Sequence, residues 1–316
     1  MDRKSSLDTL LTEQPNPASA GIDARSTSEI CAIINEQDRR VAGSVAAVLP
    51  SIAKAVEMIA ARLGQGGRLF YIGAGTSGRL GVLDAAECRP TFNVPSDLVQ
   101  GIIAGGPRAL ARATEDSEDD AASGAADLVA RGFTSKDVLM GIAASGRTPY
   151  VLGAIAEARR LGAYTIGLSC TPNSELARAA DMDITPLPGP EIITGSTRMK
   201  AGTATKLVLN MISTAVMIRL GYVYGNLMVN VQPTNEKLRH RGLRILSQAT
   251  GVSSAQAMDL LEKAGSIRAA IVMNLCGVDR ARAEELLRET QNRVSAALEK
   301  GRTLEEEGTP EKGCNG

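Results

Sequence analysis

Five short apolar segments, each ending in a loop of small residues, constrain what this chain of 316 residues can fold into. They are RLFYIGAGTSG, LVQGIIAGG (98–106), KDVLMGIAASGRT (136–148), AYTIGLSCTPNS (163–174) and a weaker fifth, MDITPLPGPEIITGSTRMK (182–200), which prolines interrupt. Helical stretches at 107–131 and 149–161 lie between them. Short buried strands that alternate with helices favour a parallel sheet, because right-handed crossovers place helices on both faces. The sequence therefore predicts an α/β fold whose ligand binds at the carboxyl ends of the strands, where the loops lie.

The pattern becomes helical after Gly195, and the segment 199–220 reads as one long, largely buried helix. Residues 253–290 then predict a compact module of three short helices, with Ser253 and Gln256 forming a capping box and Asp279 capping the last helix. We expect a sheet domain at 1–240, a three-helix module at 241–300 and a disordered tail at 301–316.

Composition argues against several classes of protein. Lys plus Arg and Asp plus Glu each number 35, so no global field attracts nucleic acid or an anionic membrane. Five scattered cysteines without a CxxC pair favour reduced thiols over disulfides or a metal site. The N-terminus lacks the apolar core of a signal peptide, and no uninterrupted apolar run approaches the roughly 20 residues of a membrane span. We therefore expect a cytoplasmic protein.

The shortage of histidine limits the chemistry, because His240 is the single histidine of the chain. It lies in KLRHRG, where an exposed or interface role is the simplest interpretation. Carboxylates or lysines are therefore the expected agents of any acid–base catalysis.

The glycines of the first loop fit the GxGxxG pattern of a dinucleotide site, but the rest of that signature is missing. A dinucleotide fold places an acid at the end of its second strand, and here that strand ends in IIAGG. Asp97 lies at about the right distance from the glycines but precedes the strand. A nicotinamide enzyme is therefore the weakest of the functions considered.

Hydroxyl side chains recur beside glycine or arginine in three of the loops, GAGTSGR, AASGRT and TGSTRMK. One such loop is explained by turn formation or helix capping alone, but three in one sheet indicate a site. Hydroxyls and free N–H groups at helix N-termini suit a phosphate monoester and sugar hydroxyls. The predicted ligand-binding residues are Gly75, Thr76, Ser77, Gly78, Arg79, Ser145, Gly146, Arg147, Thr148, Ser196, Thr197 and Lys200. The three cations among them could neutralise a phosphate or form structural ion pairs.

Longer stretches resemble one family. The loops look like those of a sugar isomerase (SIS) phosphosugar-binding domain, and the chain resembles the N-acetylmuramic acid 6-phosphate etherase family over nearly its whole length. The matching stretches are TEQPNPASAGID (12–23), GAGTSGRLGVLDAAECRPTF (73–92), GIAASGRTPYVLGA (141–154), GSTRMKAGTATKLVLNMISTAVMI (195–218) and GNLMVNVQPTNEKL (225–238). The resemblance implies cleavage of the lactyl ether of a phosphosugar during cell-wall recycling, without metal or cofactor. It also implies that the C-terminal helices form a ubiquitin-associated-like (UBA-like) bundle.

The family's two catalytic glutamates fall on Glu87, in DAAECRP, and Glu118, in TEDSEDD. The resemblance assigns Glu87 as the acid that assists lactate departure and Glu118 as the base. Glu87 is expected near the end of a helix that stops before Pro90, partly buried, which suits a proton donor. Glu118 is expected in the first turn of a helix capped by Ser117, which suits a proton acceptor. Without the resemblance, EDSEDD would be taken for a solvated charge run.

Two other functions use the same fold. A sugar-phosphate isomerase would share the proton chemistry but release nothing, and a phosphosugar sensor would bind without turnover. We also expect a homodimer, because helix 199–220 is more apolar than a one-sided helix needs and SIS domains commonly pair. In such a dimer the segment 12–23 is expected to contribute across the interface.

Overall fold

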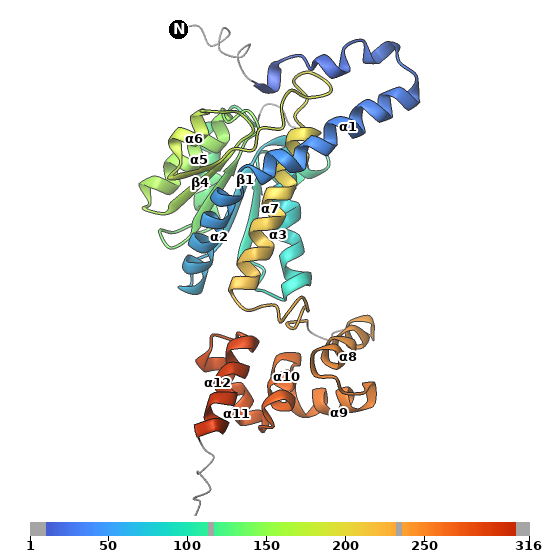
Figure 1. Ribbon diagram of the computed structural model, residues 1–316. Coiled ribbons are helices and arrows are strands. Elements are labelled where there is room, and N and C mark those ends of the chain that lie inside the picture. Colours follow the sequence, from blue (N-terminus) through green and yellow to red (C-terminus); the bar gives the residue numbers. More distant parts are fainter. Residues whose placement is uncertain (1–10, 113–116, 232–235, 308–316) are drawn as a thin grey trace, which may run out of the picture. The chain divides into compact units, whose positions relative to one another are not determined.

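The computed structural model of the chain describes residues 11–112, 117–231 and 236–307. It divides into two compact units, the first formed by Met1–Cys88 and Pro95–Val216 and the second by Arg89–Val94 and Met217–Gly316 (Figure 1). The first unit holds the sheet and the second is helical. The division falls earlier than the boundary expected at residue 240, so the proposed three-part domain organisation stays a prediction.

A five-stranded parallel sheet forms the centre of the first unit, in the order β2-β1-β3-β4-β5. The strands are β1 (Leu69–Gly73), β2 (Val99–Ile103), β3 (Val138–Ile142), β4 (Tyr164–Leu168) and β5 (Met182–Ile184). All five lie within the apolar segments of the sequence, so the predicted α/β fold is confirmed.

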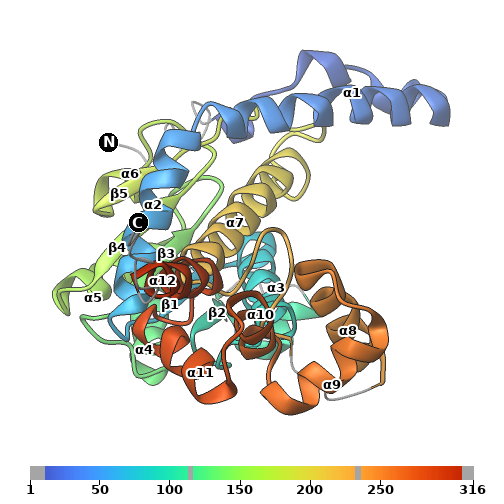
Figure 2. The same ribbon diagram turned by 60° about the horizontal axis from the view of Figure 1, so that its bottom comes forward.

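Helices cover both faces of the sheet, as the crossovers require. One layer contains α2 (Leu49–Gly64), α3 (Gly75–Phe92) and α7 (Lys200–Arg219), which lie side by side in Figures 1 and 2. The opposite face packs against α4 (Ala121–Ala130) and α5 (Pro149–Arg160), where Phe70 and Ile72 meet Leu128 and Tyr150 in one cluster. Tyr71, between those two strand residues, points the other way and packs on α3. The sheet is therefore buried from both sides.

Helix α7 is the long helix predicted at 199–220. By length and composition alone it could cross a bilayer, but 56% of its apolar window is buried inside the structure. Val208, Leu209 and Ile212 are fully buried, so α7 serves as a core helix of the first unit.

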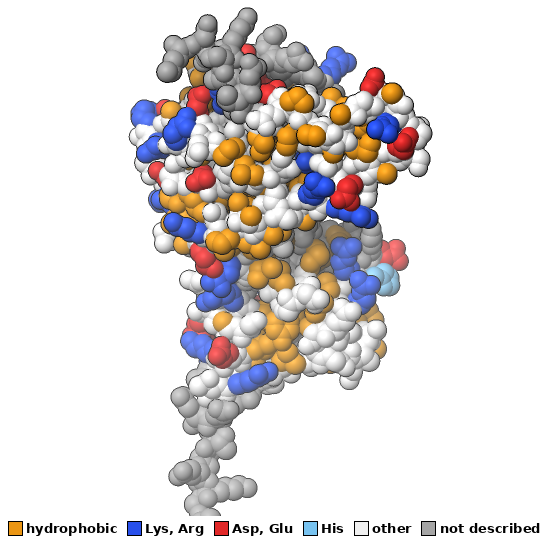
Figure 3. Space-filling model, turned by 45° about the horizontal axis from the view of Figure 1, so that its top comes forward, with side chains coloured by type: hydrophobic (Ala, Val, Ile, Leu, Met, Phe, Trp, Pro, Cys, Tyr) orange, Lys and Arg blue, Asp and Glu red, His pale blue; other side chains and the backbone are white. Residues whose placement is uncertain are grey.

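Hydrophobic side chains are exposed on the layer that contains α2, α3 and α7. Leu49, Leu83 and Met211, one from each helix, are exposed by 46%, 56% and 39%. Figure 3, which views the molecule from near this side, shows hydrophobic side chains between charged ones on the surface. Helix α1 (Thr27–Ala46), which begins with a capping box of Ser26 and Glu29, extends beyond the sheet in Figures 1 and 2.

The stretch 107–131 is not the helix that its composition predicts. A 3-10 helix, η5 (Gly106–Leu110), follows β2, and α4 begins only at Ala121. Gly105 and Gly106 both have positive φ and turn the chain out of the strand. The N-cap of α4 is Asp120, whose carboxylate accepts from the Ser123 amide, so the expectation that Ser117 caps this helix is wrong.

The second unit contains α8 (Glu236–Thr250), α9 (Ser254–Ala264), α10 (Ile267–Cys276), α11 (Arg280–Glu289) and α12 (Val294–Glu307). The capping box of Ser253 and Gln256 and the Asp279 cap are confirmed. Helix α8 crosses the expected boundary at residue 240, and α12 continues seven residues into the segment expected to be a disordered tail. The remainder of that tail, 308–316, lies outside the described residues.

A glycine contact between α4 and α5 gives a test of this packing. A Cβ atom at Gly124 would lie 1.9 Å from the carbonyl oxygen of Tyr150, so Gly124→Ala must push the helices apart. We expect a loss of about 1–3 kcal/mol in unfolding free energy, measured by urea denaturation. The control is Gly43→Ala in α1, where a Cβ meets nothing within 4 Å. That change is expected to stabilise by about 0.5–1 kcal/mol, and equal effects of the two variants would contradict the packing.

Candidate active site

The loop between β1 and α3 requires glycine at Gly73 and Gly78 because the chain folds tightly back on itself. A Cβ at Gly78 would lie 2.5 Å from the Gly73 carbonyl oxygen and 2.7 Å from Ile103 Cγ1. This turn brings the N-terminus of α3, with Thr76 and Ser77, to the carboxyl end of the sheet. Its unpaired backbone N–H groups there form the kind of site that binds anions.

The loop between β3 and α5 lies beside it, since β1 and β3 are hydrogen-bonded neighbours. Gly146 has φ +66°, and a Cβ there would lie 2.3 Å from Ser174 Cβ. Ser174 caps α6 (Glu175–Ala179) and exchanges a 3.1 Å hydrogen bond with Ser169. The loops after β3 and β4 are therefore packed against one another.

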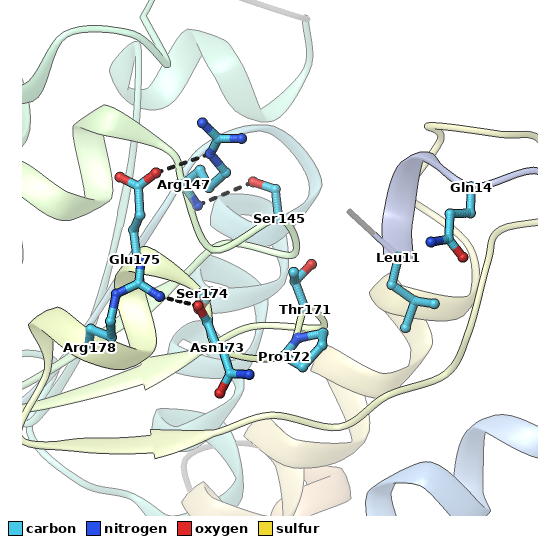
Figure 4. A pocket seen from close by; sticks show the side chains of 10 residues that line it. All are labelled: Leu11, Gln14, Ser145, Arg147, Thr171, Pro172, Asn173, Ser174, Glu175 and Arg178. Atoms are coloured by element: carbon cyan, nitrogen blue, oxygen red, sulfur yellow. Dashed lines mark hydrogen bonds and ion pairs between the residues drawn. The ribbon is translucent and has the colours of Figure 1, made fainter. Parts of the chain in front are cut away.

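A cleft of about 430 Å³ opens at these two loops (Figure 4). Arg147 lines it and donates to Glu175 Oε1 at 3.1 Å, while Arg178 donates to the Asn173 carbonyl. Figure 4 shows Leu11 and Gln14 of the N-terminal segment on the far side of the cleft from that ion pair. The lining is Leu11, Gln14, Ser145, Arg147, Thr171, Pro172, Asn173, Ser174, Glu175 and Arg178.

Of the predicted ligand residues, Ser145 and Arg147 line the cleft. The β4–α6 loop also lines it, although that loop was not predicted from the sequence to belong to the site. That loop, CTPNS, carries two hydroxyl residues after a strand but lacks the adjacent glycine or arginine of the other three. The serine directly before the ELARA helix is the one local signal for this loop, because serine is favoured at a helix N-cap.

The third predicted loop reaches the site through the N-terminus of α7. Ser196 and Thr197 lie just before the helix and are half-buried. A Cβ at Gly202, in the first turn, would lie 3.5 Å from Thr76 Cγ2, so the starts of α3 and α7 are close neighbours.

Lys200 points into the protein rather than toward a ligand, with 2% of its surface exposed. Its ammonium donates to Gln37 Oε1 at 3.1 Å and to the Pro190 carbonyl at 3.0 Å, and burial lowers its pKa. The buried Glu191 carboxylate accepts from the amides of Lys200 and Ala201 and so caps α7. Lys200 is thus placed as a structural cation.

Arg79 is also committed to structure. Its guanidinium donates to the carbonyls of Leu110 and Arg112 at 3.2 and 3.3 Å, which ties α3 to the end of η5. Of the three predicted cations, only Arg147 lines the cleft.

Glu118 lies in the loop before α4, exposed, rather than in the first turn of a helix. Thr148 Oγ1 donates to its carboxylate at 2.9 Å, and the Tyr150 amide donates to its backbone carbonyl at 3.1 Å. The start of α5 therefore holds Glu118 near the carboxyl end of β3.

Glu87 is exposed on α3, and the expectation of partial burial at a helix end is wrong for a single chain. The helix continues to Phe92 with Pro90 inside it, because Pro90 removes only one hydrogen bond close to the end of the helix. Leu83, one turn before Glu87, is itself 56% exposed.

The two glutamates do not lie at the same end of the unit. Glu87 follows the first residue of α3 by twelve positions, or roughly 18 Å along the helix axis. Glu118 is held at the start of α5, beside the loops. The structure therefore brings Glu118, Thr148 and Ser145 to one region and leaves Glu87 on the outer surface of the α2–α3–α7 layer.

The N-terminal segment docks on its own chain. The Asn16 amide donates to Gln37 Oε1 and to the Pro190 carbonyl, and the Ser19 hydroxyl donates to the Ile192 carbonyl at 2.7 Å. These contacts fix the segment beside Lys200. Its expected role across an interface stays a prediction.

A substitution of Lys200 separates a structural role from ligand binding. Lys200→Met is expected to lower the unfolding free energy by about 1–2 kcal/mol, because the loss of charge-assisted hydrogen bonds is partly offset by relief of a buried charge. The KM for a phosphosugar should stay within about twofold. Arg198→Met, at an exposed position of the same loop, is the control for stability. A raised KM with unchanged thermal unfolding would show that Lys200 meets the phosphate.

Comparisons with known proteins identify the domain type. Residues 120–215 match the family model described as SIS domain, and residues 51–159 match the glucokinase regulatory protein N-terminal SIS domain. A phosphoheptose isomerase from Francisella tularensis shares 20% identity over 61% of this chain and 98% of its own, with a TM-score of 0.47, too low to bear on function.

Relatives that match along most of the chain share one name, N-acetylmuramic acid 6-phosphate etherase. That of Serratia proteamaculans is 52% identical over 92% of this chain and 99% of its own length. Those of Symbiobacterium thermophilum and Trichormus variabilis are 58% and 53% identical over 86% and 92% of this chain, and 91% and 94% of their own. With identity this high over nearly the full length, the chain belongs to the N-acetylmuramic acid 6-phosphate etherase family.

Proposed function

We propose that this protein cleaves the D-lactyl ether of N-acetylmuramic acid 6-phosphate with water, giving N-acetylglucosamine 6-phosphate and D-lactate in cell-wall recycling. The observation that carries this is the name shared by relatives 52–58% identical over 86–92% of the chain. The four described cysteines are free thiols, three of them buried, which suits the reducing cytoplasm.

The carboxyl end of the sheet supports binding of the 6-phosphate. The N-terminus of α3 presents backbone N–H groups and the Thr76 and Ser77 hydroxyls, and the adjacent β3–α5 loop adds Ser145. Arg147 supplies a cation on the cleft wall, paired with Glu175 on one side. A phosphate there accepts hydrogen bonds from hydroxyls and amides while a guanidinium balances its charge.

The ether becomes labile once the sugar ring opens. The C3–O bond then lies beta to the C1 aldehyde, so removal of the C2 proton lets the C2–C3 double bond form as the lactate oxygen leaves with its bonding electrons. A proton donor delivers a proton to that oxygen. Water then adds at C3 and a proton returns to C2. Each step therefore needs only a proton transfer, the departure of lactate or the addition of water. The carboxyl groups of two glutamates suffice as base and acid for these steps.

We assign the base to Glu118 and the acid to Glu87. Glu118 is supported by its place beside the phosphate loop, where Thr148 holds its carboxylate. Glu87 follows Ser77 by ten positions on α3, or roughly 15 Å along the helix axis. Glu87 and Glu118 of one chain are therefore poorly placed to serve one sugar ring.

A second copy of the chain would resolve this separation. Glu87 shares its helix with the exposed Leu83, and Met211 of the neighbouring α7 is also exposed. We propose that this face pairs with the same face of a second copy and that the partner brings Glu87 to the site of Glu118. Apolar side chains exposed on one face of a soluble unit are typical of such interfaces.

The proposed roles are tested by measuring D-lactate release and C2 hydrogen exchange in deuterated water on the same variants. Glu118→Gln should abolish both, because the base acts before every other step. Glu87→Gln should lower lactate release by about a hundredfold to ten-thousandfold while exchange persists, because general acid catalysis is lost and the base is intact.

Glu262→Gln, at an exposed position of α9 in the helical unit, is the control for the loss of one carboxylate. Loss of exchange and lactate release together in a folded Glu87→Gln protein would mean that the two roles must be exchanged or merged. Exchange without any lactate release by the wild type would instead favour a sugar-phosphate isomerase, and binding without exchange would favour a sensor.

Dimerisation is tested with Leu83→Asp. Placing a charge on the proposed interface should give a monomer in sedimentation experiments, with lactate release reduced at least tenfold and an unchanged circular dichroism spectrum. Val129→Asp is the matched control, since Val129 is 52% exposed on α4, on the opposite face of the sheet. A monomeric wild-type protein that is fully active at assay concentration would exclude the shared site.

A further inference from the structure

The hydroxyl of Thr148 is turned away from both roles that its sequence position suggests. Thr148 occupies the N-cap of α5, yet its side chain makes no capping hydrogen bond. It also belongs to the Ser145–Thr148 loop at the cleft, yet it is 6% exposed and does not line the cleft. Its hydroxyl donates instead to Glu118 Oε1 at 2.9 Å.

We propose that Thr148 is a positioning residue for Glu118, the base, and not a ligand of the phosphate. This inference rests on the proposed function, in which Glu118 removes the C2 proton. A threonine hydroxyl carries one proton. When that proton is donated to Glu118, the hydroxyl has none left to donate to a phosphate oxygen.

The backbone around Thr148 fixes the direction of this hydrogen bond. Pro149 follows, which disfavours the helical conformation at Thr148, and the residue has φ −55° and ψ 113°. The Tyr150 amide donates to the Glu118 carbonyl at 3.1 Å, so the main chain of Glu118 is held two residues further along. The first turn of α5 therefore clamps Glu118 through both its backbone and its carboxylate.

Packing of α4 against α5 holds the two sides of this clamp together. The Tyr150 hydroxyl donates to Asp127 Oδ2 at 2.6 Å. A Cβ at Gly153 would lie 2.0 Å from the Ala121 carbonyl oxygen, so the start of α4 lies directly on α5. Glu118 precedes α4 by three residues, and this contact limits how far it can move from Thr148.

Residues of the same loop therefore have different roles. Ser145 and Arg147 line the cleft and meet the ligand, whereas Thr148 orients the group that takes the proton. Loss of the Thr148 hydroxyl should therefore lower kcat and leave the affinity for the phosphosugar unchanged, and loss of the Ser145 hydroxyl should do the reverse.

The test compares Thr148→Val, Thr148→Ala and Thr148→Ser for D-lactate release and C2 exchange with N-acetylmuramic acid 6-phosphate. Both variants without a hydroxyl should lose about tenfold to a hundredfold in kcat and in exchange, the equivalent of one hydrogen bond to a charged group, with KM within about twofold. Thr148→Ser should recover most of the rate. Calorimetry with N-acetylglucosamine 6-phosphate should show wild-type affinity for all three variants and weaker binding for Ser145→Ala.

Thr165→Val is the matched structural control. Thr165 is a buried residue near the start of β4, away from the site. The substitution removes its hydroxyl, which donates to Asp181 Oδ2 at 2.8 Å. It should lower thermal stability and leave kcat unchanged.

A raised KM or weaker phosphosugar binding with kcat retained in Thr148→Val or Thr148→Ala would overturn the inference and return Thr148 to the phosphate site. A Thr148→Ser variant no better than Thr148→Ala would overturn it as well. A wild-type protein that releases no D-lactate would contradict the proposed function itself, and the inference about Thr148 would then fail too. An active wild type with any of the contrary variant results leaves the function standing and removes only the role of Thr148.

Discussion

The parallel pairing of β1 with β3 decides where chemistry can take place in this protein. It sets the β1–α3 loop beside the β3–α5 loop, each leading into a helix whose N-terminus faces the same edge of the sheet. Gly78 can have no side chain because the β1–α3 turn folds back onto the Gly73 carbonyl, and Gly146 can have none because Ser174 of the β4–α6 loop packs against it. Helix N-termini gathered at one edge favour binding of an anion, so the proposed phosphate site rests first on backbone geometry.

Two buried titratable groups on α3 serve packing rather than the proposed reaction. Asp84, on α3, is buried and accepts from Asn210 and Ser213 of α7, and burial raises its pKa. Burial also raises the pKa of the neighbouring Cys88 thiol to about 12 and keeps it protonated. These contacts bind α3 to α7 and fix the layer whose outer surface carries Glu87.

The buried cluster around Lys200 performs the same task at the other end of α7. Asn16 and Lys200 both donate to the Pro190 carbonyl and to Gln37 Oε1, which joins the N-terminal segment, α1 and α7. Glu191 completes the cluster by capping α7 with a buried carboxylate, which is favoured at a helix N-terminus. The start of α7 is thus supported by polar contacts between protein groups, while Glu118 is held by the Thr148 hydroxyl and the Tyr150 amide.

The sequence by itself determined the five strands, the small-residue loops, the caps of α9 and α11 and the family. Each of these depends on signals within a few residues, such as apolar runs, glycines that permit close turns and a serine or aspartate before a helix. It did not reveal that α3 continues through Pro90 or that α4 starts after Glu118. Such boundaries depend on which of several neighbouring residues forms the capping hydrogen bond. Only the tertiary structure decided that Lys200 and Arg79 bond to protein carbonyls and that the Thr148 hydroxyl reaches Glu118. The partner of a polar side chain is set by whichever distant element packs beside it, and 30 residues separate Thr148 from Glu118.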